Sequence, residues 1–306
     1  MIQPMNNTVK IAGIGYCGMD YLCIVPRIPI DDKVEIVQSL TQGGGPAATA
    51  VVASARLGAK AVFCGTVGDD ERGVQIVGEL KSEGVDTSGV MVRRHAESPA
   101  GFSWIDCKSG KRSIAWSRGD AAPLALDEMP PDLLDGVDIL HLDGHQTEVA
   151  IAAAKRARDC GVLVSLDAGT ILPGIDELLE LADIVIASEH FAAAYTGDVS
   201  MSDSVKKLFF GPRKFTGVTT GRNGSVGFDG DKLLKCPPHQ VKEVVDTTGA
   251  GDVYHGAFAV AVASGMSWFD CMRFATVAAA FKCTALGGRT AIPNFETVEN
   301  LMNKSC

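Results

Sequence analysis

The sequence predicts an α/β fold in which helices cover both faces of a mainly parallel sheet, giving three layers, with a small β-sheet beside them as a lid. From residue 137 onward, apolar β-branched runs alternate with helical segments, which is typical of βαβ units. Two β-rich stretches, 16–42 and 91–118, lack such helices between their strands. We expect these stretches to form the lid and the remainder to form the core.

The elements of the N-terminal half follow from short apolar runs and their breakers. The predicted strands are 9–15, 21–25, 34–40, 61–67, 91–92, 101–106 and 111–116, the last two joined by a turn at 108–110. Helices are predicted at 46–57 and 71–82. Pro46 suits a first helical turn and Gly58 suits a C-terminal cap, so the first of these helices is well delimited.

The C-terminal half continues the alternation. Strands are predicted at 137–142, 162–167, 183–187 and 241–245, with helices at 148–160 and 175–181. A further helix follows residue 252, and Ser267 opens the last long helix as a capping residue. This order of elements predicts one doubly wound domain spanning residues 1–306.

Composition excludes several classes of function. The 306 residues carry 28 Lys and Arg against 37 Asp and Glu, a net charge of −9, which disfavours nucleic acids and anionic membranes as partners. No apolar run approaches the roughly 20 residues that span a bilayer. The nine cysteines form no C-x-x-C pair and are expected to be reduced. We expect a cytoplasmic protein that holds any anionic ligand locally.

A glycine motif near the N-terminus has two interpretations. Residues 13–18 match G-x-G-x-x-G, which in a dinucleotide-binding fold seats a pyrophosphate at the start of a helix. Here the following residues are β-prone and Pro26 and Pro29 come soon after, so the required helix is missing. We expect a glycine turn at a strand end, with NAD binding as the rival.

The string Asp246-Thr247-Thr248-Gly249-Ala250-Gly251-Asp252, hereafter the signature, precedes an apolar helical run. Gly249, Ala250 and Gly251 leave backbone N–H groups open at a helix start, where an anion is favoured. An aspartate beside such a cradle repels phosphate unless it accepts a proton from an attacking hydroxyl. Asp252 is therefore the predicted general base, although capping alone also favours an aspartate in a first turn.

Together with three further stretches, the signature makes the chain resemble the PfkB/ribokinase family of sugar kinases over nearly its whole length. The stretches are "GGGPAATAVVASARLG" at 43–58, "GTVGDDERG" at 65–73 and "VTTGRNGSVGF" at 218–228. The resemblance implies a ribokinase-like core and lid, a sugar acceptor, ATP as phosphoryl donor, Mg²⁺, a monovalent cation such as K⁺, and dimerisation through the lid.

The resemblance also assigns roles to matching residues. It implies that Asp252 is the base, that Gly249, Ala250 and Gly251 form the anion hole, and that Asp20 binds the acceptor hydroxyl. Gly43, Gly44 and Gly45 match the backbone that closes over the sugar. The residues expected on the nucleotide side are Thr220, Gly221, Gly224, Thr248 and Gly288.

Two departures from the family bear on substrate and metal. Ribose kinases usually carry asparagine where this chain has Ala48, and alanine cannot hydrogen-bond a sugar. The N-x-x-E element that orders Mg²⁺ is represented by residues 188–191, with Phe191 in place of its glutamate. Glu189 is the candidate substitute for Mg²⁺, and Asp246 is the candidate ligand of a monovalent cation.

The substrate is expected to be a ketose. "GGGPAATA", "FKCTALGGRTAIP" and "SEH" resemble the sulfofructose kinase branch, which implies 6-deoxy-6-sulfofructose, with fructose as the neutral counterpart. An anionic tail needs cations, for which the candidates are Lys33, Arg94, Arg118 and Arg289. A ribose, sugar acid or nucleoside acceptor remains open, as does a sensor without turnover.

Three histidines are weaker candidates. His141, Asp143 and His145 suggest a metal by composition, but they follow a strand, where i and i+4 do not share a face as on a helix. We interpret them as a loop on the sugar side. His255 lies one turn beyond Asp252 and is expected either to touch a ligand or to pack in the core.

Overall fold

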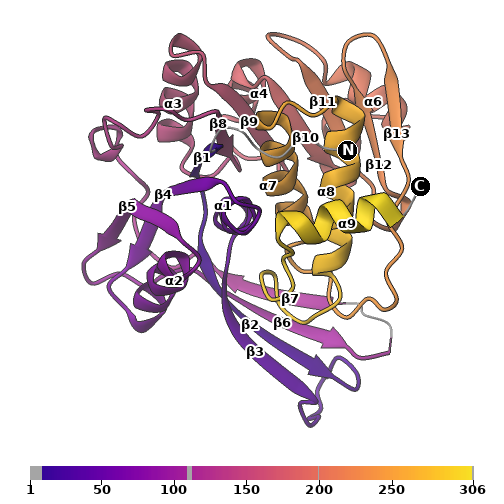
Figure 1. Ribbon diagram of the computed structural model, residues 1–306. Coiled ribbons are helices and arrows are strands. Elements are labelled where there is room, and N and C mark those ends of the chain that lie inside the picture. The colour runs from indigo at the N-terminus through magenta and orange to yellow at the C-terminus, as the bar shows by residue number, and fades with distance from the viewer. Residues whose placement is uncertain (1–8, 109–111, 199, 305–306) are drawn as a thin grey trace.

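A nine-stranded, mainly parallel sheet forms the centre of the computed structural model, which describes residues 9–108, 112–198 and 200–304 (Figure 1). Its strand order is β13-β12-β11-β10-β9-β8-β1-β4-β5, and β12 runs antiparallel to both of its neighbours. The strands are β1 Lys10–Ile14, β4 Lys60–Gly68, β5 Val85–Arg93, β8 Ile139–Leu142, β9 Leu163–Ala168, β10 Ile184–Ser188, β11 Phe215–Thr219, β12 Ser225–Phe228 and β13 Leu233–Cys236. The predicted α/β class is confirmed.

Helices cover both faces of this sheet. Because successive strand residues point to opposite faces, Ile11 of β1 packs in one core cluster and Ala12 in the other. The first cluster contains side chains of α1 Pro46–Arg56, α2 Glu71–Ser82, α7 Ala250–Ala263, α8 Trp268–Lys282 and α9 Phe295–Lys304. The second contains side chains of α3 Thr147–Asp159, α4 Ile175–Leu181, α5 Glu189–Thr196 and α6 Met201–Lys207.

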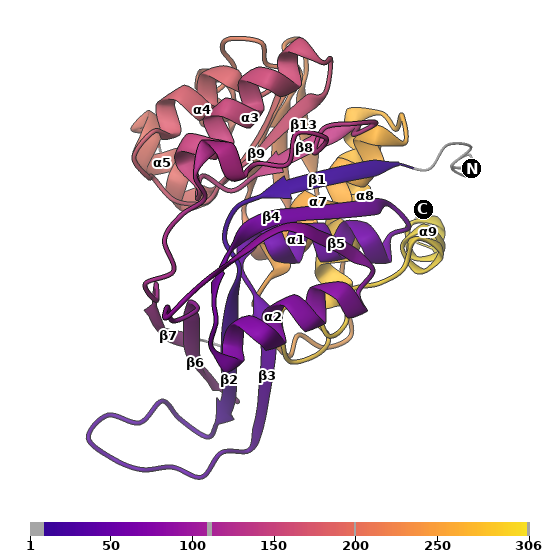
Figure 2. The same cartoon turned by 90° about the vertical axis from the view of Figure 1, so that its left-hand side faces the viewer.

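The lid is a separate four-stranded sheet in the order β3-β2-β6-β7 (Figures 1 and 2). Its strands are β2 Gly18–Val25, β3 Gln38–Gly44, β6 Ala100–Asp106 and β7 Arg112–Ser117. Figure 2 shows the connection between β2 and β3 reaching away from the rest of the molecule. The predicted turn at 108–110 lies partly outside the described residues, and the predicted strand at 111–116 begins outside them.

The lid boundary differs from the prediction at one place. Met91 and Val92 belong to β5, which pairs with β4 at the edge of the large sheet, so the second lid segment begins at β6. A short β-branched run does not reveal which sheet it joins, because both sheets favour the same residue types. The strand predicted at 34–40 likewise begins later, at Gln38, and extends to Gly44.

The structure contradicts the rival interpretation of NAD binding at residues 13–18 and the predicted strand at residues 241–245. Gly18 starts strand β2, so no helix follows residues 13–18 and the NAD interpretation is wrong. The run 241–245 is not a strand: the N–H of Val245 bonds to the carbonyl of Cys283 at the end of α8 (2.8 Å). This segment has the residue types that favour a strand, but in the described chain it does not pair with the edge of a sheet.

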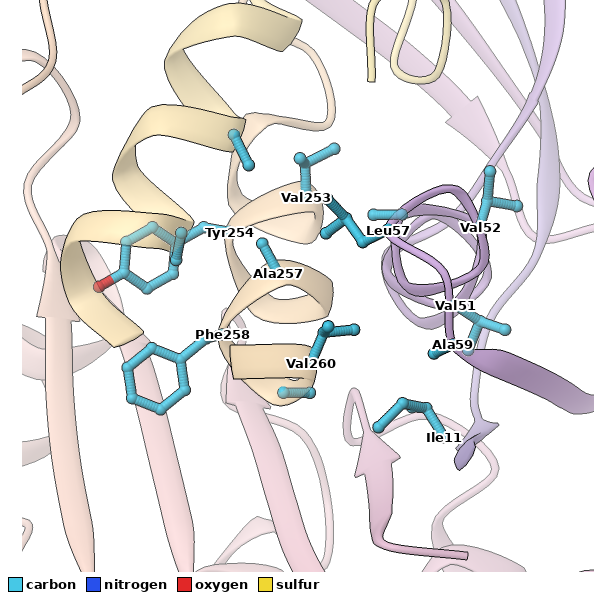
Figure 3. Packing of buried hydrophobic residues seen from close by; sticks show 14 of the residues in the cluster. Ile11, Val51, Val52, Leu57, Ala59, Val253, Tyr254, Ala257, Phe258 and Val260 are labelled. Atoms are coloured by element: carbon cyan, nitrogen blue, oxygen red, sulfur yellow. The ribbon is translucent and has the colours of Figure 1, made fainter. Parts of the chain in front are cut away.

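Helices α1 and α7 pack against each other and so join the two halves of the site (Figure 3). Leu57 and Val253 lie among the buried side chains between them. A Cβ atom at Gly256 would overlap the carbonyl oxygen of Ala50, so only glycine permits this approach. The glycines before α1 and the signature before α7 are thereby held by one rigid pair of helices. Within the described ranges, every helix is too short or too polar to cross a lipid bilayer.

Candidate active site

The signature ends in an open backbone cradle at the start of α7. Gly249, just before the helix, has φ of 73°, and a Cβ there would lie 2.8 Å from the Cα of Gly288. Only glycine satisfies both the left-handed backbone and this approach. A Cβ at Gly251 would meet nothing within 4 Å, so the backbone is open in front. Because the first N–H groups of a helix lack intrahelical acceptors, those of Gly249 and Gly251 suit a phosphate, whereas that of Ala250 bonds to the carbonyl of Thr247 (3.2 Å).

Asp252 stands in the first turn of α7 in an environment that makes it a weak acid. Burial is the main cause that raises the pKa of its carboxyl to about 7, and the nearby charges of Asp167, Asp20 and Asp143 act in the same direction. His255 opposes the rise. A carboxylate with a pKa near neutrality is a stronger proton acceptor than an ordinary aspartate, which is what a general base requires.

Asp167 of β9 and His255 of α7 form a buried pair beside Asp252. The Nε2 of His255 lies 3.3 Å from an Asp167 carboxylate oxygen. Burial alone would lower the pKa of His255, but Asp167 raises it overall. His141, whose ring centre is 5.5 Å from that of His255, has its pKa lowered to about 3 by burial and stays neutral. His255 is thus packed in the core, where its charge partner is Asp167.

Asp20 lies on β2 against the glycines that end β3. A Cβ atom at Gly44 would overlap its carboxylate, and a Cβ at Gly101 would come within 2.9 Å of its Oδ1. Burial raises the pKa of Asp20 to about 6, while Arg289 lowers it. Gly45, with φ of 98°, turns the chain into α1. The structure therefore brings together Asp20 and the predicted acceptor glycines.

Arg289 was predicted as one of the cations that could bind an anionic substrate tail, but the structure buries it. It is only 1% exposed, and its guanidinium donates to the carbonyl of Gly44 (3.1 Å) and to the hydroxyl of Thr49 (3.3 Å). A Cβ at Gly43 would lie 2.7 Å from its Nη1. Arg289 supports the acceptor glycines from behind and is not a surface cation.

Asp143 organises the loop that follows β8. Its carboxylate accepts hydrogen bonds from the backbone N–H groups of Tyr16 (2.8 Å), Ala47 (3.1 Å) and His145 (2.9 Å). The rings of Tyr16 and His145 lie 5.1 Å apart. Asp143 and His145 therefore shape a loop, in keeping with the loop interpretation. Within the described residues, no cluster of three or more His, Cys, Asp or Glu side chains is arranged to hold a metal.

The predicted lid cations Lys33, Arg94 and Arg118 are exposed. Arg118 lies 5.1 Å over the ring of Trp116, a residue that no motif marked. Trp116 pairs with Gly101, and Gly101 pairs with Asp20, so all three residues point to one face of the lid. At 58% exposure, Trp116 offers a flat apolar surface on the face that carries Asp20. The alternation of β7 would have revealed it once its register was known.

Arg112, also overlooked, connects the lid to the signature. Its guanidinium donates to the hydroxyl of Thr247 at 3.0 Å. The residue opens β7, so the lid and the signature are in contact in this structure. No motif marked Arg112, because the contact joins residues far apart in sequence.

A cavity of about 340 Å³ lies beside the cradle. Its lining includes two of the predicted nucleotide residues, Gly221 and Gly224, together with Ala250 and Gly251 of the signature. Thr220 donates from its hydroxyl to the Gly224 carbonyl (2.9 Å) and so shapes the turn. Apolar residues of α8 and of the 238–244 segment contribute much of the remaining lining: Pro238, Val241, Val244, Ala279 and Ala280. This mix of apolar walls and an open anion cradle suits a nucleotide.

The other two predicted nucleotide residues belong to the support of the cradle. Thr248 donates its N–H (2.9 Å) and its hydroxyl (2.8 Å) to the Oδ1 of Asp246. The Oδ2 of Asp246 accepts the N–H of Gly287 at 2.9 Å, which places Gly288 behind Gly249. Asp246 therefore ties the signature to the 287–288 turn.

The region that corresponds to the family's metal element is altered. Phe191 is 2% exposed and stacks on Tyr195, so its side chain belongs to the core. Ser188 caps α5 by accepting the N–H of Phe191 (3.1 Å). Glu189 is exposed at the start of α5, just beyond the end of β10. Glu189 thus offers the accessible carboxylate of this segment.

The chain is similar over nearly its whole length to known carbohydrate kinases. The pfkB family of carbohydrate kinases matches residues 9–294. The chain is 31% identical to ribokinase of Bacillus subtilis, over 96% of this chain and 99% of that protein. It is 30% identical to fructokinase-2 of Oryza sativa subsp. japonica, over 96% and 94%. The structure of Arabidopsis thaliana ribokinase complexed with ribose and ATP superposes with a TM-score of 0.84 at 27% identity, over 97% and 99%.

Proposed function

The chain belongs to the pfkB family of carbohydrate kinases, and from that premise we propose that it transfers the γ-phosphoryl group of ATP to a hydroxymethyl group of a ketose such as fructose. One observation carries the proposal: two half-buried carboxylates, Asp252 beside the phosphate cradle and Asp20 on the lid, lie near enough for the charge of Asp20 to raise the pKa of Asp252. The Arabidopsis relative, complexed with ribose and ATP, supports ATP as donor.

In the proposed step, Asp20 accepts a hydrogen bond from the sugar and orients the reacting hydroxyl toward the phosphorus. That hydroxyl gives its proton to Asp252 while its oxygen bonds to the γ-phosphorus, and the bond to the β-phosphate oxygen breaks to release ADP. The N–H groups of Gly249 and Gly251, together with that of Ala250 once it leaves the carbonyl of Thr247, stabilise the charge on the transferring group. Closure of the lid excludes water.

Mg²⁺ fits this site as a partner of the nucleotide. In proteins it is commonly held by one or two carboxylates plus substrate phosphates, so a three-residue protein cluster is not needed. Glu189, with its exposed carboxylate, is the proposed holder. When bound, Mg²⁺ supplies positive charge that neutralises the donor phosphates.

A ketose is favoured over ribose by a residue in the first turn of α1. Ala48 is fully buried in α1 where ribose kinases usually carry asparagine, and its methyl group cannot hydrogen-bond a sugar. The rice fructokinase supports the same choice. The exposed Arg118 beside Trp116 supports 6-deoxy-6-sulfofructose, whose anionic tail needs a cation.

Steady-state kinetics with a panel of acceptors tests this choice. We expect fructose or 6-deoxy-6-sulfofructose to give the highest kcat/KM, above ribose, sugar acids and nucleosides. Trp116→Ala should raise the acceptor KM by about fivefold, since a lost stacking surface costs on the order of 1 kcal/mol, and should leave the KM for ATP unchanged. A highest kcat/KM for ribose or a nucleoside contradicts the ketose assignment.

The pH dependence of turnover follows from the environment of Asp252. Its pKa is raised to about 7, and only the deprotonated carboxylate accepts a proton. We therefore expect kcat to be low below pH 6, to rise through about 7 and to level off above it. Asp20, with a pKa of about 6, contributes to the acid limb of kcat/KM. A kcat that is flat from pH 5 to 9, with product release shown not to limit the rate, contradicts Asp252 as the base.

The resemblance also supports a dimer through the lid. On the face of the lid opposite Asp20, Phe102 is 42% exposed and stacks on Tyr21, with ring centres 4.9 Å apart. A second copy of the chain covering these rings would bury them from water. Light scattering should give twice the monomer mass at micromolar concentration, and Phe102→Asp should give the monomer mass.

A sensor that binds sugar and ATP without turnover is the second candidate. It is favoured by the burial of Phe191 where the family places a glutamate near Mg²⁺. Binding of both ligands in calorimetry without release of ADP would support it.

A further inference from the structure

Lys282 is a buried charge that the proposed mechanism does not use. It is the last residue of α8, its exposure is 0%, and it is among the largest fully buried side chains of the described chain. Fully buried lysines are rare unless a partner compensates the charge. Its Nζ donates to the carbonyl oxygen of Asp246 at 2.8 Å, so it contacts the first residue of the signature.

The charges around Lys282 belong to the active site. Burial lowers the pKa of its ammonium, whereas Asp246 and Asp252 oppose that change and Arg112 adds to it. The N–H groups of Val245 and Asp246 bond to the carbonyl of the neighbouring Cys283 (2.8 and 3.2 Å). The end of α8 and its terminal cation therefore hold the turn that leads into the phosphate cradle.

The monovalent cation implied by the family resemblance does not fit this turn. The Oδ1 of Asp246 accepts two hydrogen bonds from Thr248, and the Oδ2 accepts one from Gly287. Its carbonyl oxygen accepts the bond from Lys282. A free cation placed here would stand beside a fixed positive charge in a poorly solvated pocket, where like charges repel strongly.

We propose that the ammonium group of Lys282 is the built-in cation of the signature turn and that the chain needs no free K⁺ there. The inference rests on the proposed function for its kinetic readout. Lys282 acts as a positioning residue: it fixes the Asp246 carbonyl, and through the turn it sets the N–H groups of Gly249 to Gly251 for the transferring phosphoryl group.

The first test uses the wild-type chain in potassium chloride and in tetramethylammonium chloride at equal ionic strength. We expect kcat to agree within about twofold. We also expect the melting midpoint to be the same in both salts, because a bound cation would raise it by several degrees. Activation by K⁺ of about tenfold or more, or a clear K⁺-dependent rise in the midpoint, overturns the inference.

The second test removes the charge and keeps the bulk, with Lys282→Met. Loss of an organising charge should lower kcat by about tenfold or more and change the KM for ATP by less than about threefold. Lys304→Met is the matched control, because Lys304 is also the last residue of its helix but is exposed. Equal kcat in the two variants overturns the positioning role.

Failure of this inference can be separated from failure of the proposed function. The melting comparison in the two salts needs no substrate, so it tests the cation even if no acceptor in the panel is phosphorylated. If Lys282→Met does not fold, the wild-type comparison in the two salts still decides whether a free cation binds.

Discussion

Asp252→Asn should lower sugar-dependent turnover by about 10²- to 10⁴-fold, the range that a positioned general base contributes. Asparagine keeps the shape of the side chain but cannot accept the proton of the attacking hydroxyl. Nucleotide binding should be retained, because the cradle is made of backbone N–H groups. Coupled detection of ADP measures the loss, and calorimetry with an ATP analogue measures the binding.

The same variant should be more stable than the wild type at alkaline pH. The pKa of Asp252 is raised from 3.8 to about 7, so above pH 7 the native state holds a charge that the unfolded chain carries more easily. The neutral amide removes this cost. We therefore expect a higher melting midpoint at pH 8, with the difference disappearing at pH 4, where the carboxylate is already protonated in the native state.

Asp270→Asn is the matched control. Asp270 is the third residue of α8, as Asp252 is the third residue of α7, and it takes part in the cap at Ser267. If Asp252 were only a favourable charge at a helix start, each variant should lose up to about 1 kcal/mol in its free energy of unfolding and keep its activity. Full activity of Asp252→Asn contradicts its role as base.

Gly44→Ala should lower kcat/KM for the sugar by about 10²-fold, since displacing a positioning group by about 1 Å has that effect. The added methyl group would overlap the carboxylate of Asp20, which is confined on its other side by Gly101. The KM for ATP should be unchanged because the nucleotide cavity is lined by other residues.

Gly78→Ala controls for the substitution itself. Gly78 lies inside α2, and an added Cβ would meet nothing within 4 Å. Alanine should stabilise this helix by about 0.5–1 kcal/mol and leave catalysis unchanged. A Gly44→Ala variant with the kinetics of Gly78→Ala contradicts the proposed tight fit between Asp20 and the acceptor glycines.

Local patterns predicted those parts of the fold that depend on nearby residues. Helices α2 and α4 have the predicted bounds, and Gly249 to Asp252 lie at a helix start as the signature indicates. The run 241–245 was wrongly predicted as a strand because composition cannot show whether a neighbouring strand edge exists. Likewise, Met91 and Val92 were placed in the wrong sheet.

The sequence predicted those site residues that belong to a local backbone motif. It did not predict residues whose role depends on burial by distant parts of the chain. Asp252 and Asp20 were predicted as site residues through motifs, and the charge of Asp20 acts on Asp252 in the folded chain. Arg289 was found as a cation, but its burial behind Gly44 needed the structure. Lys282 was overlooked because a lysine at a helix end usually lies in solvent, and only the tertiary packing of α8 on the signature buries it.

The most direct test of the account is the stoichiometry of the reaction. The chain is incubated with ATP, Mg²⁺ and fructose or 6-deoxy-6-sulfofructose, and phosphosugar is measured by ³¹P NMR against the ADP released. The account predicts one phosphosugar per ADP, with the phosphate on a hydroxymethyl oxygen and neither product formed by Asp252→Asn. ADP accompanied only by free phosphate, or bound ATP without any phosphosugar from the panel of acceptors, would contradict it.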